Sequence, residues 1–286
     1  MLLSEPMKKH TTFRIGGPAD YFLMPQSEKE AADAVAVCRE EQVPYSIVGN
    51  GSNLLVSDSG YRGVVIQLYK EMSRVQTEGT HIYAQAGASL AKVAAAAMEA
   101  GLAGFEFAAG IPGTLGGACV MNAGAYGGEM KDVLANVTVL DESGRIRKLA
   151  GSELELGYRT SIIAKKGYIV LGAEIELTRG NLDEIRGLMN ELRDKRVSKQ
   201  PLEYPSAGST FKRPEGYFAG KLIQDAGLRG FRVGGAMVSE KHCGFVINAG
   251  EATAAEVDSL MKQVAERVRA QFDVALEPEV KRLGEF

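Results

Sequence analysis

The feature that most constrains the fold of this chain is a pair of glycine-rich segments, Val48-Gly49-Asn50-Gly51-Ser52-Asn53 and Gly110-Ile111-Pro112-Gly113-Thr114-Leu115-Gly116-Gly117. A dinucleotide-binding βαβ unit needs a third glycine where its helix packs on the strand, and the first segment has Leu54 at that place. Neither segment contains the Gly-Lys-Ser/Thr of a P-loop. Both segments instead offer backbone N–H groups exposed by glycine, which can surround an anion without a cationic side chain.

Composition excludes several classes of protein. With 286 residues, 45% of them hydrophobic, the chain can bury the cores of two or three domains. Its three cysteines, Cys38, Cys119 and Cys243, are far apart and form no Cys-x-x-Cys pair, which predicts buried thiols and argues against disulfides or a zinc site. Only three histidines are present, so a histidine-rich metal centre is not expected, and a net charge of −3 gives no reason to expect a nucleic-acid partner.

The hydropathy pattern predicts no attachment to a membrane. No apolar run approaches the length of a membrane span, and the first six residues lack the basic region and apolar stretch of a secretory signal. We therefore expect a cytoplasmic protein, with a monomer as the default state.

Helix starts are indicated by capping boxes, in which a short polar residue is followed three positions later by glutamate. Three pairs fit, Ser27/Glu30, Asn181/Glu184 and Thr253/Glu256, and the last begins a helix whose residues 257, 260, 264 and 268 form one apolar face. An alanine-rich helix is expected at 90–100, ending at Gly101. Strands are expected at 45–48, 63–68, 81–86 and 168–177, in a hairpin over 133–149 that turns at 141–144, and at 274–280.

This order of elements predicts an α+β fold with two or three small lobes, because helices and strands do not alternate regularly enough for one doubly wound sheet or a barrel. We place the breaks near Glu71 and near Arg196, where a polar segment with two prolines begins. The predicted parts are therefore 1–70, 71–196 and 197–272, with 273–286 completing the first part.

Three further segments could carry chemistry, and each has an ordinary structural alternative. Gly157-Tyr158-Arg159 could hold a guanidinium against a carboxylate, or Arg159 could lie on a solvated face. Gly208-Ser209 precedes two cations and could be an ordinary polar turn; it is not a nucleophile elbow, because Gly-x-Ser-x-Gly is absent. In a strand at 274–280, Glu277 and Glu279 would point to the same face, either inward or toward solvent. The glycine segments themselves could be tight turns or a dinucleotide site.

Taken together and in this order, these segments resemble the UDP-N-acetylenolpyruvoylglucosamine reductase (MurB) family over nearly the whole chain. The resemblance rests on residues 11–19, 49–55, 110–117, 122–127, 157–159, 208–211 and 276–280. It implies an FAD-binding fold of the vanillyl-alcohol oxidase type, with flavin lobes at 1–70 and 71–196 and a substrate-binding domain at 197–272. It also implies that FAD is held by Gly49, Asn50, Gly51, Ser52, Asn53, Leu54, Gly110, Ile111, Pro112, Gly113, Thr114, Gly116, Gly117, Ala118, Asn122, Gly124 and Ala125.

The resemblance also assigns functional residues. It implies that Arg159, Ser209 and Glu279 are catalytic, with Arg159 polarising a carboxylate and Ser209 donating a proton. Substrate contacts are implied for Tyr158, Lys199, Arg213, Arg229 and His242. Arg213 and Arg229 replace asparagine and lysine of some members, and both suit a diphosphate. His242 replaces glutamine. Leu177-Thr178-Arg179-Gly180 runs directly into the next helix, which indicates the class that lacks a tyrosine-bearing substrate loop.

The reaction implied by the resemblance is reduction of UDP-N-acetylglucosamine enolpyruvate to UDP-N-acetylmuramate by NADPH, with FAD as the cofactor. Glu279 is expected to be protonated, because an ionised carboxylate would oppose the charge that develops on the substrate. Two alternatives are a different FAD-dependent oxidoreductase on the same fold, such as an alcohol or sugar oxidase, and a non-catalytic nucleotide-binding module.

Overall fold

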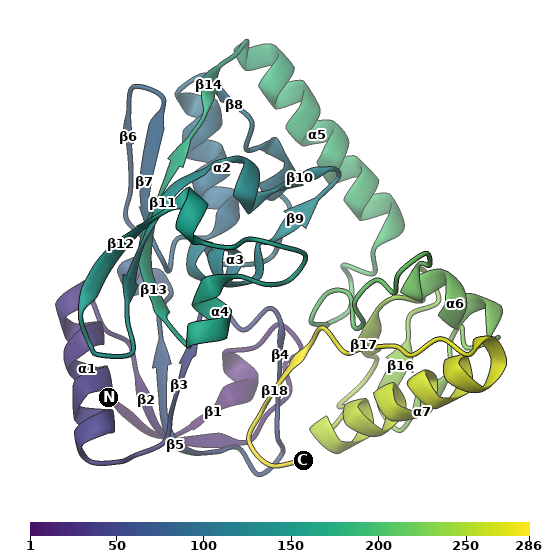
Figure 1. Ribbon diagram of the computed structural model, residues 1–286. Coiled ribbons are helices and arrows are strands. Elements are labelled where there is room, and N and C mark those ends of the chain that lie inside the picture. The colour runs from purple at the N-terminus through teal and green to yellow at the C-terminus, as the bar shows by residue number, and fades with distance from the viewer. The chain divides into compact units, whose positions relative to one another are not determined.

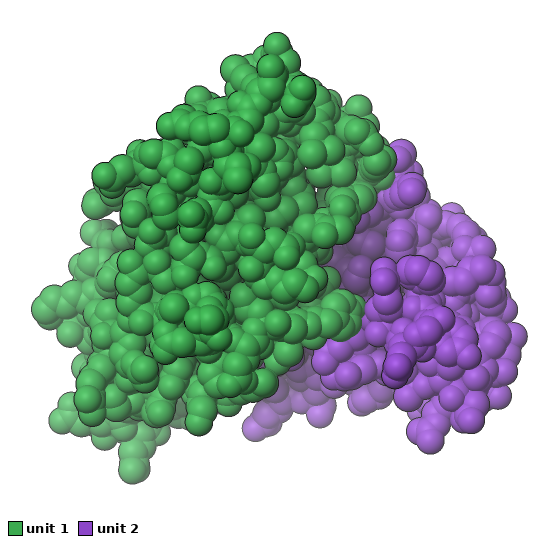
Figure 2. All heavy atoms as spheres, turned by 45° about the horizontal axis from the view of Figure 1, so that its top comes forward, with its two compact units in different colours: residues 1, 23–50, 64–196 green, residues 2–22, 51–63, 197–286 purple.

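The computed structural model describes residues 1–286, and Figure 1 shows its elements. The chain forms two compact units, which Figure 2 colours separately. Unit 1 contains residues 1, 23–50 and 64–196, and unit 2 contains residues 2–22, 51–63 and 197–286. Residues 2–22 and 51–63 thus group with the C-terminal part of the chain, whereas the sequence places them in a first flavin lobe. The division into two flavin lobes and a substrate domain stays a prediction.

Unit 1 is built on a five-stranded antiparallel sheet in the order β12-β11-β13-β7-β6. Within this sheet, β11 pairs with β12 and β13, so that Val137 lies opposite Leu149 on one side and Ala173 on the other. Val137, Leu149 and Ala173 are all buried, and they share the core face of the sheet because residues directly opposite one another on paired strands point to the same side. The strands are β6 (Val75–Glu78), β7 (His81–Gln85), β11 (Leu134–Leu140), β12 (Ile146–Ala150) and β13 (Ile169–Glu176).

Helices α2 (Leu90–Glu99) and α3 (Leu115–Met121) pack against this sheet (Figure 1). The Ser89 hydroxyl caps α2 by accepting a hydrogen bond from the Lys92 N–H, and the chain leaves the helix through Gly101 at a φ of +65°. The sequence prediction for this helix is therefore confirmed. Its apolar face is buried in the core of unit 1.

The remaining helices of unit 1 follow their predicted caps. Ser27 accepts from the N–H of Glu30 at the start of α1 (Glu28–Glu40), and Asn181 Oδ1 accepts from the N–H of Glu184 at the start of α5 (Leu182–Lys199), whose last three residues lie in unit 2. The smaller elements include helix α4 (Ile162–Lys166) and strand β3 (Tyr45–Val48), which pairs in parallel with β5 (Tyr61–Gln67). Two short strand pairs are also present. One joins β8 (Leu102–Ala103) to β14 (Thr178–Arg179), and the other joins β9 (Gly124–Ala125) to β10 (Gly128–Glu129).

Unit 2 has a second core between helix α7 (Ala254–Phe272) and a three-stranded sheet. The predicted capping box is present, because Thr253 Oγ1 accepts from the N–H of Glu256 while Glu256 accepts from the N–H of Thr253. Residues 257, 260, 264 and 268 are buried, as their spacing predicts. The sheet contains β15 (Arg232–Val233), β16 (Ala236–Val238) and β17 (Val246–Asn248), and α6 (Ala219–Asp225) packs on α7.

Two strand pairs complete unit 2. Strand β1 (Leu2–Pro6) is antiparallel to β2 (Pro18–Leu23), and β4 (Leu54–Val56) is parallel to β18 (Lys281–Leu283). Among the helices, none combines the length and apolar character needed to cross a membrane. The three cysteines are buried thiols, as predicted.

The strand predicted at 274–280 is wrong. Within that segment only Pro278 makes a strand-like contact, an isolated bridge to Phe211, and β18 begins later at Lys281. Pro278 has no N–H to donate, so a regular ladder cannot run through it. As a result Glu277 is exposed and pairs with Lys212, whereas Glu279 is buried, and the two carboxylates do not share a face.

Candidate functional site

The first glycine segment connects β3 to β4 and is held in place through its carbonyl groups. In unit 1, the Leu68 N–H donates to the Val48 carbonyl at 2.8 Å and the Gln67 side chain donates to the Gly49 carbonyl at 3.0 Å. In unit 2, the Thr12 N–H donates to the Gly51 carbonyl at 3.3 Å. Because these bonds use carbonyls, the N–H groups of the segment remain the natural donors to an anionic ligand.

Close packing explains two glycines of this segment. A Cβ added to Gly49 would lie 2.4 Å from Thr114 Oγ1, so the two glycine segments lie directly side by side in unit 1. Gly51 has a φ of +67°, and a Cβ there would lie 2.1 Å from the His10 carbonyl oxygen. Neither position has room for a larger residue. The structure therefore brings together Gly49 and Thr114, which the sequence assigns to the same ligand.

The second glycine segment uses several of its N–H groups inside the protein. Leu115 and Gly116 donate to the backbone carbonyls just beyond the end of β7, both at 2.8 Å. The Ile111 N–H donates to the carbonyl of Ala108, just before the segment, and the Gly113 N–H donates to the Ile111 carbonyl within it. The sequence suggests that N–H groups along the whole segment can bind an anion, but those that bond within the protein are already used. The N–H groups at residues 110, 114 and 117 are therefore the candidate donors to a diphosphate.

Asn122, Gly124 and Ala125 follow helix α3. Asn122 ends that helix in the left-handed conformation, with a φ of +45°, and its side chain is bound within the protein. Gly124 and Ala125 form strand β9, and the two residues that join it to β10 have φ values of +54° and +93°. This is the pattern of a tight two-residue hairpin turn.

Arg159 lies in a tight turn of unit 1. The N–H of Thr160 donates to the Gly157 carbonyl at 3.3 Å, and the N–H of Gly157 donates to the Thr160 carbonyl at 3.1 Å. Arg159 has a φ of +55°, a conformation that is unfavourable for residues other than glycine and that often marks functional sites. Its guanidinium carbon lies 5.1 Å from the centre of the Tyr158 ring, within range of a cation–π contact.

Ser209 and Glu279 are brought together in unit 2 by a short antiparallel pairing. The Glu279 N–H donates to the Thr210 carbonyl at 2.8 Å, and the Lys212 N–H donates to the Glu277 carbonyl at 2.9 Å. Ser209 is exposed at one end of this pairing, whereas Glu279 is only 9% exposed. Two motifs separated by about seventy residues of sequence therefore meet, which the sequence could not show by spacing alone.

The end of the first glycine segment reaches the same place in unit 2. Asn53 Nδ2 donates to the Glu279 carbonyl at 3.2 Å, and the Lys281 N–H donates to the Asn53 carbonyl at 2.9 Å. Asn53 thus fixes the backbone on both sides of Val280. Asn53, which the resemblance assigns to FAD binding, therefore bonds directly to the backbone of Glu279, the predicted catalytic glutamate.

The predicted substrate residues of unit 2 have different surroundings. Burial lowers the pKa of His242, whose Nδ1 accepts from the Gly244 N–H at 3.1 Å, so the neutral ring carries its proton on Nε2. Arg229 donates to the Glu240 carbonyl and to Gln224 Oε1, so part of its donor capacity supports the chain. The guanidinium carbon of Arg213 lies 4.5 Å from the centre of the Phe218 ring, and Lys199 is exposed at the end of α5.

Sequence reasoning missed Arg196. Its guanidinium donates to the carbonyl of Gly110, and a Cβ on Gly110 would lie 3.0 Å from Arg196 Nε. Arg196 therefore supports the second glycine segment from helix α5. No signal in the sequence could have singled it out, because it is one of several cations in a charged helix.

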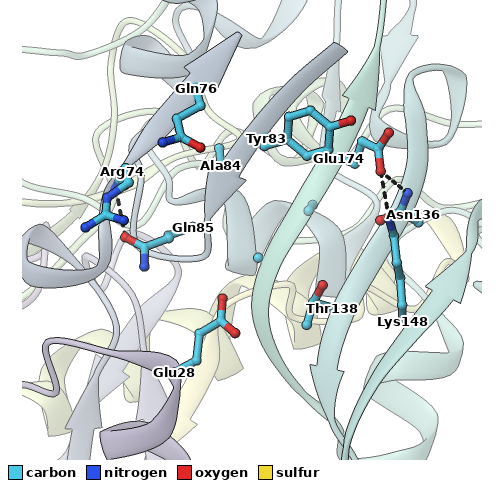
Figure 3. A pocket seen from close by; sticks show the side chains of 12 residues that line it. Glu28, Arg74, Gln76, Tyr83, Ala84, Gln85, Asn136, Thr138, Lys148 and Glu174 are labelled. Carbon is cyan, nitrogen blue, oxygen red and sulfur yellow. Dashed lines mark hydrogen bonds and ion pairs between the residues drawn. The ribbon is translucent and has the colours of Figure 1, made fainter. Parts of the chain in front are cut away.

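A separate hollow of about 290 Å³ lies on the outer face of the five-stranded sheet (Figure 3). Glu174 lines it, and hydrogen bonds from Asn136 and then Lys148 lower the pKa of that carboxyl although partial burial opposes the shift. His81 Nδ1 lies 3.0 Å from Glu174 Oε1, but the angles are not those of a hydrogen bond. None of the predicted site residues lines this hollow.

Known proteins resemble this chain over its whole length. Residues 19–150 match the family described as "FAD binding domain", which accounts for the α+β flavin fold, and residues 200–283 match "UDP-N-acetylenolpyruvoylglucosamine reductase, C-terminal domain". Proteins named UDP-N-acetylenolpyruvoylglucosamine reductase from Agathobacter rectalis and Clostridioides difficile are 58% and 54% identical, over 100% and 99% of this chain and 95% and 93% of their own lengths. The crystal structure of UDP-N-acetylenolpyruvylglucosamine reductase (MurB) from Thermus caldophilus has a TM-score of 0.83 at 37% identity, covering 98% of this chain and 97% of that one. The chain therefore belongs to the UDP-N-acetylenolpyruvoylglucosamine reductase family.

Proposed function

We propose that this protein is an FAD-dependent reductase that uses NADPH to convert UDP-N-acetylglucosamine enolpyruvate to UDP-N-acetylmuramate in peptidoglycan synthesis. The proposal also places it in the cytoplasm as a monomer. The observation that carries the proposal is the pairing of residues 210–212 with 277–279, which sets the Ser209 hydroxyl and the Glu279 carboxyl on adjoining segments of unit 2. Family membership at 58% identity supplies the substrate class.

The glycine segments fit a flavin dinucleotide. At Gly49 and Gly51 a side chain would collide with Thr114 and with the His10 carbonyl, so glycine keeps the backbone of this segment packed closely in place. We assign the diphosphate to the N–H groups of residues 49–53 and to those at 110, 114 and 117. When bound, FAD supplies the hydride that the substrate receives.

Arg159 is assigned to the carboxylate of the enolpyruvyl group. During reduction, negative charge develops on the carbon that bears this carboxylate and spreads into its oxygens. A guanidinium can donate two parallel hydrogen bonds to a carboxylate, and its positive charge stabilises the developing charge. The fixed turn around Arg159 keeps the cation oriented before the substrate arrives, so less reorganisation is needed during the reaction.

Ser209 Oγ is assigned as the donor of the proton that completes the reduction. A hydroxyl is a weak acid, so this step relies on a strongly basic carbon and on a hydroxyl that is already in place. The flanking Thr210 holds the backbone there, because its N–H donates to the Gly244 carbonyl and its Oγ1 accepts from the Val246 N–H, both at 2.8 Å. Glu279, which is buried beside this segment, is assigned as a neutral carboxyl that donates a hydrogen bond to the substrate.

The diphosphate of the sugar nucleotide is assigned to the cations of unit 2 and to two uncharged donors. Arg213 and Arg229 can donate to phosphate oxygens in pairs, whereas Lys199 acts as a point charge. The Nε2–H of neutral His242 and the Tyr158 hydroxyl add uncharged donors.

A steady-state assay tests this function. The purified protein should be yellow, with a flavin absorption spectrum. Under anaerobic conditions it should oxidise NADPH beyond the single equivalent that reduces its FAD only when UDP-N-acetylglucosamine enolpyruvate is added. NADPH oxidation that instead requires oxygen and ignores the enolpyruvyl substrate would identify an oxidase on the same fold and overturn the proposal.

A further inference from the structure

Helix α3 links the second glycine segment to the Arg159 turn. It begins directly after Thr114 and ends at Asn122, so its seven residues span about 10 Å at 1.5 Å per residue. Val120, in the last turn of the helix, and Asn122, its C-cap, contact the residues on either side of the Arg159 turn. The helix thus joins a segment assigned to FAD with the residue assigned to the substrate carboxylate.

The Asn122 side chain uses all of its strong hydrogen-bonding groups within unit 1. Its Nδ2 donates to Glu129 Oε2 at 2.5 Å and to the Gly157 carbonyl at 3.2 Å, and its Oδ1 accepts from the Lys131 N–H at 2.8 Å. The residue is only 1% exposed. An amide with both donors and its oxygen engaged has no donor left for a cofactor.

The contact with Gly157 is one of two anchors that hold the Arg159 turn. The second is Ser161, whose Oγ donates to the Val120 carbonyl at 2.7 Å. The two anchors lie on either side of the Tyr158-Arg159 pair, and both connect it to the end of α3. A backbone conformation as unfavourable as that of Arg159 persists only where its surroundings hold it in place.

We propose that Asn122 is a positioning residue that fixes the orientation of Arg159 through the Gly157 carbonyl, and that its side chain does not contact FAD. This inference rests on the proposed function, in which Arg159 binds the substrate carboxylate. Loss of the amide releases one side of the turn, and a displacement of about 1 Å at a group that positions a substrate can slow a reaction roughly 10²-fold.

The test compares Asn122→Gly with the parent enzyme as FAD-loaded full-length protein. Glycine keeps the left-handed backbone and removes only the amide. Asp273→Gly is the matched control, because Asp273 also ends a helix, α7, at a φ of +55° but belongs to unit 2, whereas the Arg159 turn belongs to unit 1. Anaerobic stopped-flow measures the two half-reactions, which are reduction of FAD by NADPH and reduction of the substrate by the reduced enzyme. Flavin fluorescence measures the affinity for FAD. Each variant is also made in an Arg159→Met background.

We expect Asn122→Gly to slow substrate reduction by roughly 10²-fold, with FAD affinity changed by less than about threefold, and to have almost no further effect once Arg159 is methionine. Equal effects in both backgrounds, or a large loss of FAD affinity, would overturn the positioning role. If Asn122→Gly does not fold, Ser161→Ala removes the second anchor and must show the same dependence on Arg159. An Arg159→Met enzyme with normal substrate reduction would instead contradict the proposed function.

Discussion

Substituting Gly49 by alanine tests whether the two glycine segments form one binding surface. The new Cβ would lie 2.4 Å from Thr114 Oγ1 and 3.2 Å from its Cγ2, so the segments must separate or the buried Thr114 side chain must rotate. Overpacking of this kind costs about 1–3 kcal/mol. If the movement displaces N–H groups that bind FAD, the affinity for FAD falls by about 5- to 150-fold, because 1.4 kcal/mol corresponds to a factor of ten.

The assay is titration of the apoprotein with FAD, followed by quenching of flavin fluorescence. Gly187→Ala is the matched control, because Gly187 lies in helix α5 with no atom within 4 Å of an added Cβ and should bind FAD normally. Adding Thr114→Ala to Gly49→Ala removes the two closest atoms and leaves Thr114 Cβ at an ordinary distance of 3.4 Å, so it should restore part of the affinity. Unchanged FAD affinity in Gly49→Ala would refute the reasoning.

Three further predictions concern titratable groups. The pKa of buried Asp258 is lowered, because hydrogen bonds from Lys262 and Arg282 outweigh the effect of its burial. Asp258→Asn should therefore lower the free energy of unfolding by about 2 kcal/mol at neutral pH, as measured by urea titration. The parent should lose this stability as the pH falls below about 4, and the variant should show less of that loss. Because burial lowers the pKa of His242, its contribution to stability is present above about pH 6.5 and is lost as the pH falls from there toward its folded pKa. His242→Gln should therefore flatten the thermal-stability profile below about pH 6.5. Burial raises the pKa of Cys119 to about 12, so its thiol should react with a disulfide reagent only when the protein unfolds, and fast labelling of the native protein would contradict this burial.

The helices were the most predictable part of the fold. Ser27, Asn181 and Thr253 start helices in the structure because capping depends on residues only three positions apart. The strands at 45–48 and 168–177 and the hairpin at 133–149 were predictable because each carries its own apolar pattern and turn.

Interactions between distant segments were not predictable in this way. The contact of Gly49 with Thr114 and the pairing of Thr210 with Glu279 depend on tertiary folding, which local patterns do not encode. The segment 274–280 misled the prediction because its alternating pattern is that of a strand while its backbone is irregular. The resemblance assigns Asn122 to FAD, and only the three bonds of its side chain indicate another role.

The most direct test of the central claim is anaerobic stopped-flow of Ser209→Ala. If Ser209 donates the proton, reduction of FAD by NADPH should proceed at nearly the parent rate, while transfer to UDP-N-acetylglucosamine enolpyruvate should slow by at least about 10²-fold. Equal slowing of both half-reactions, or no slowing of the second, would contradict the assignment of Ser209 as the proton donor.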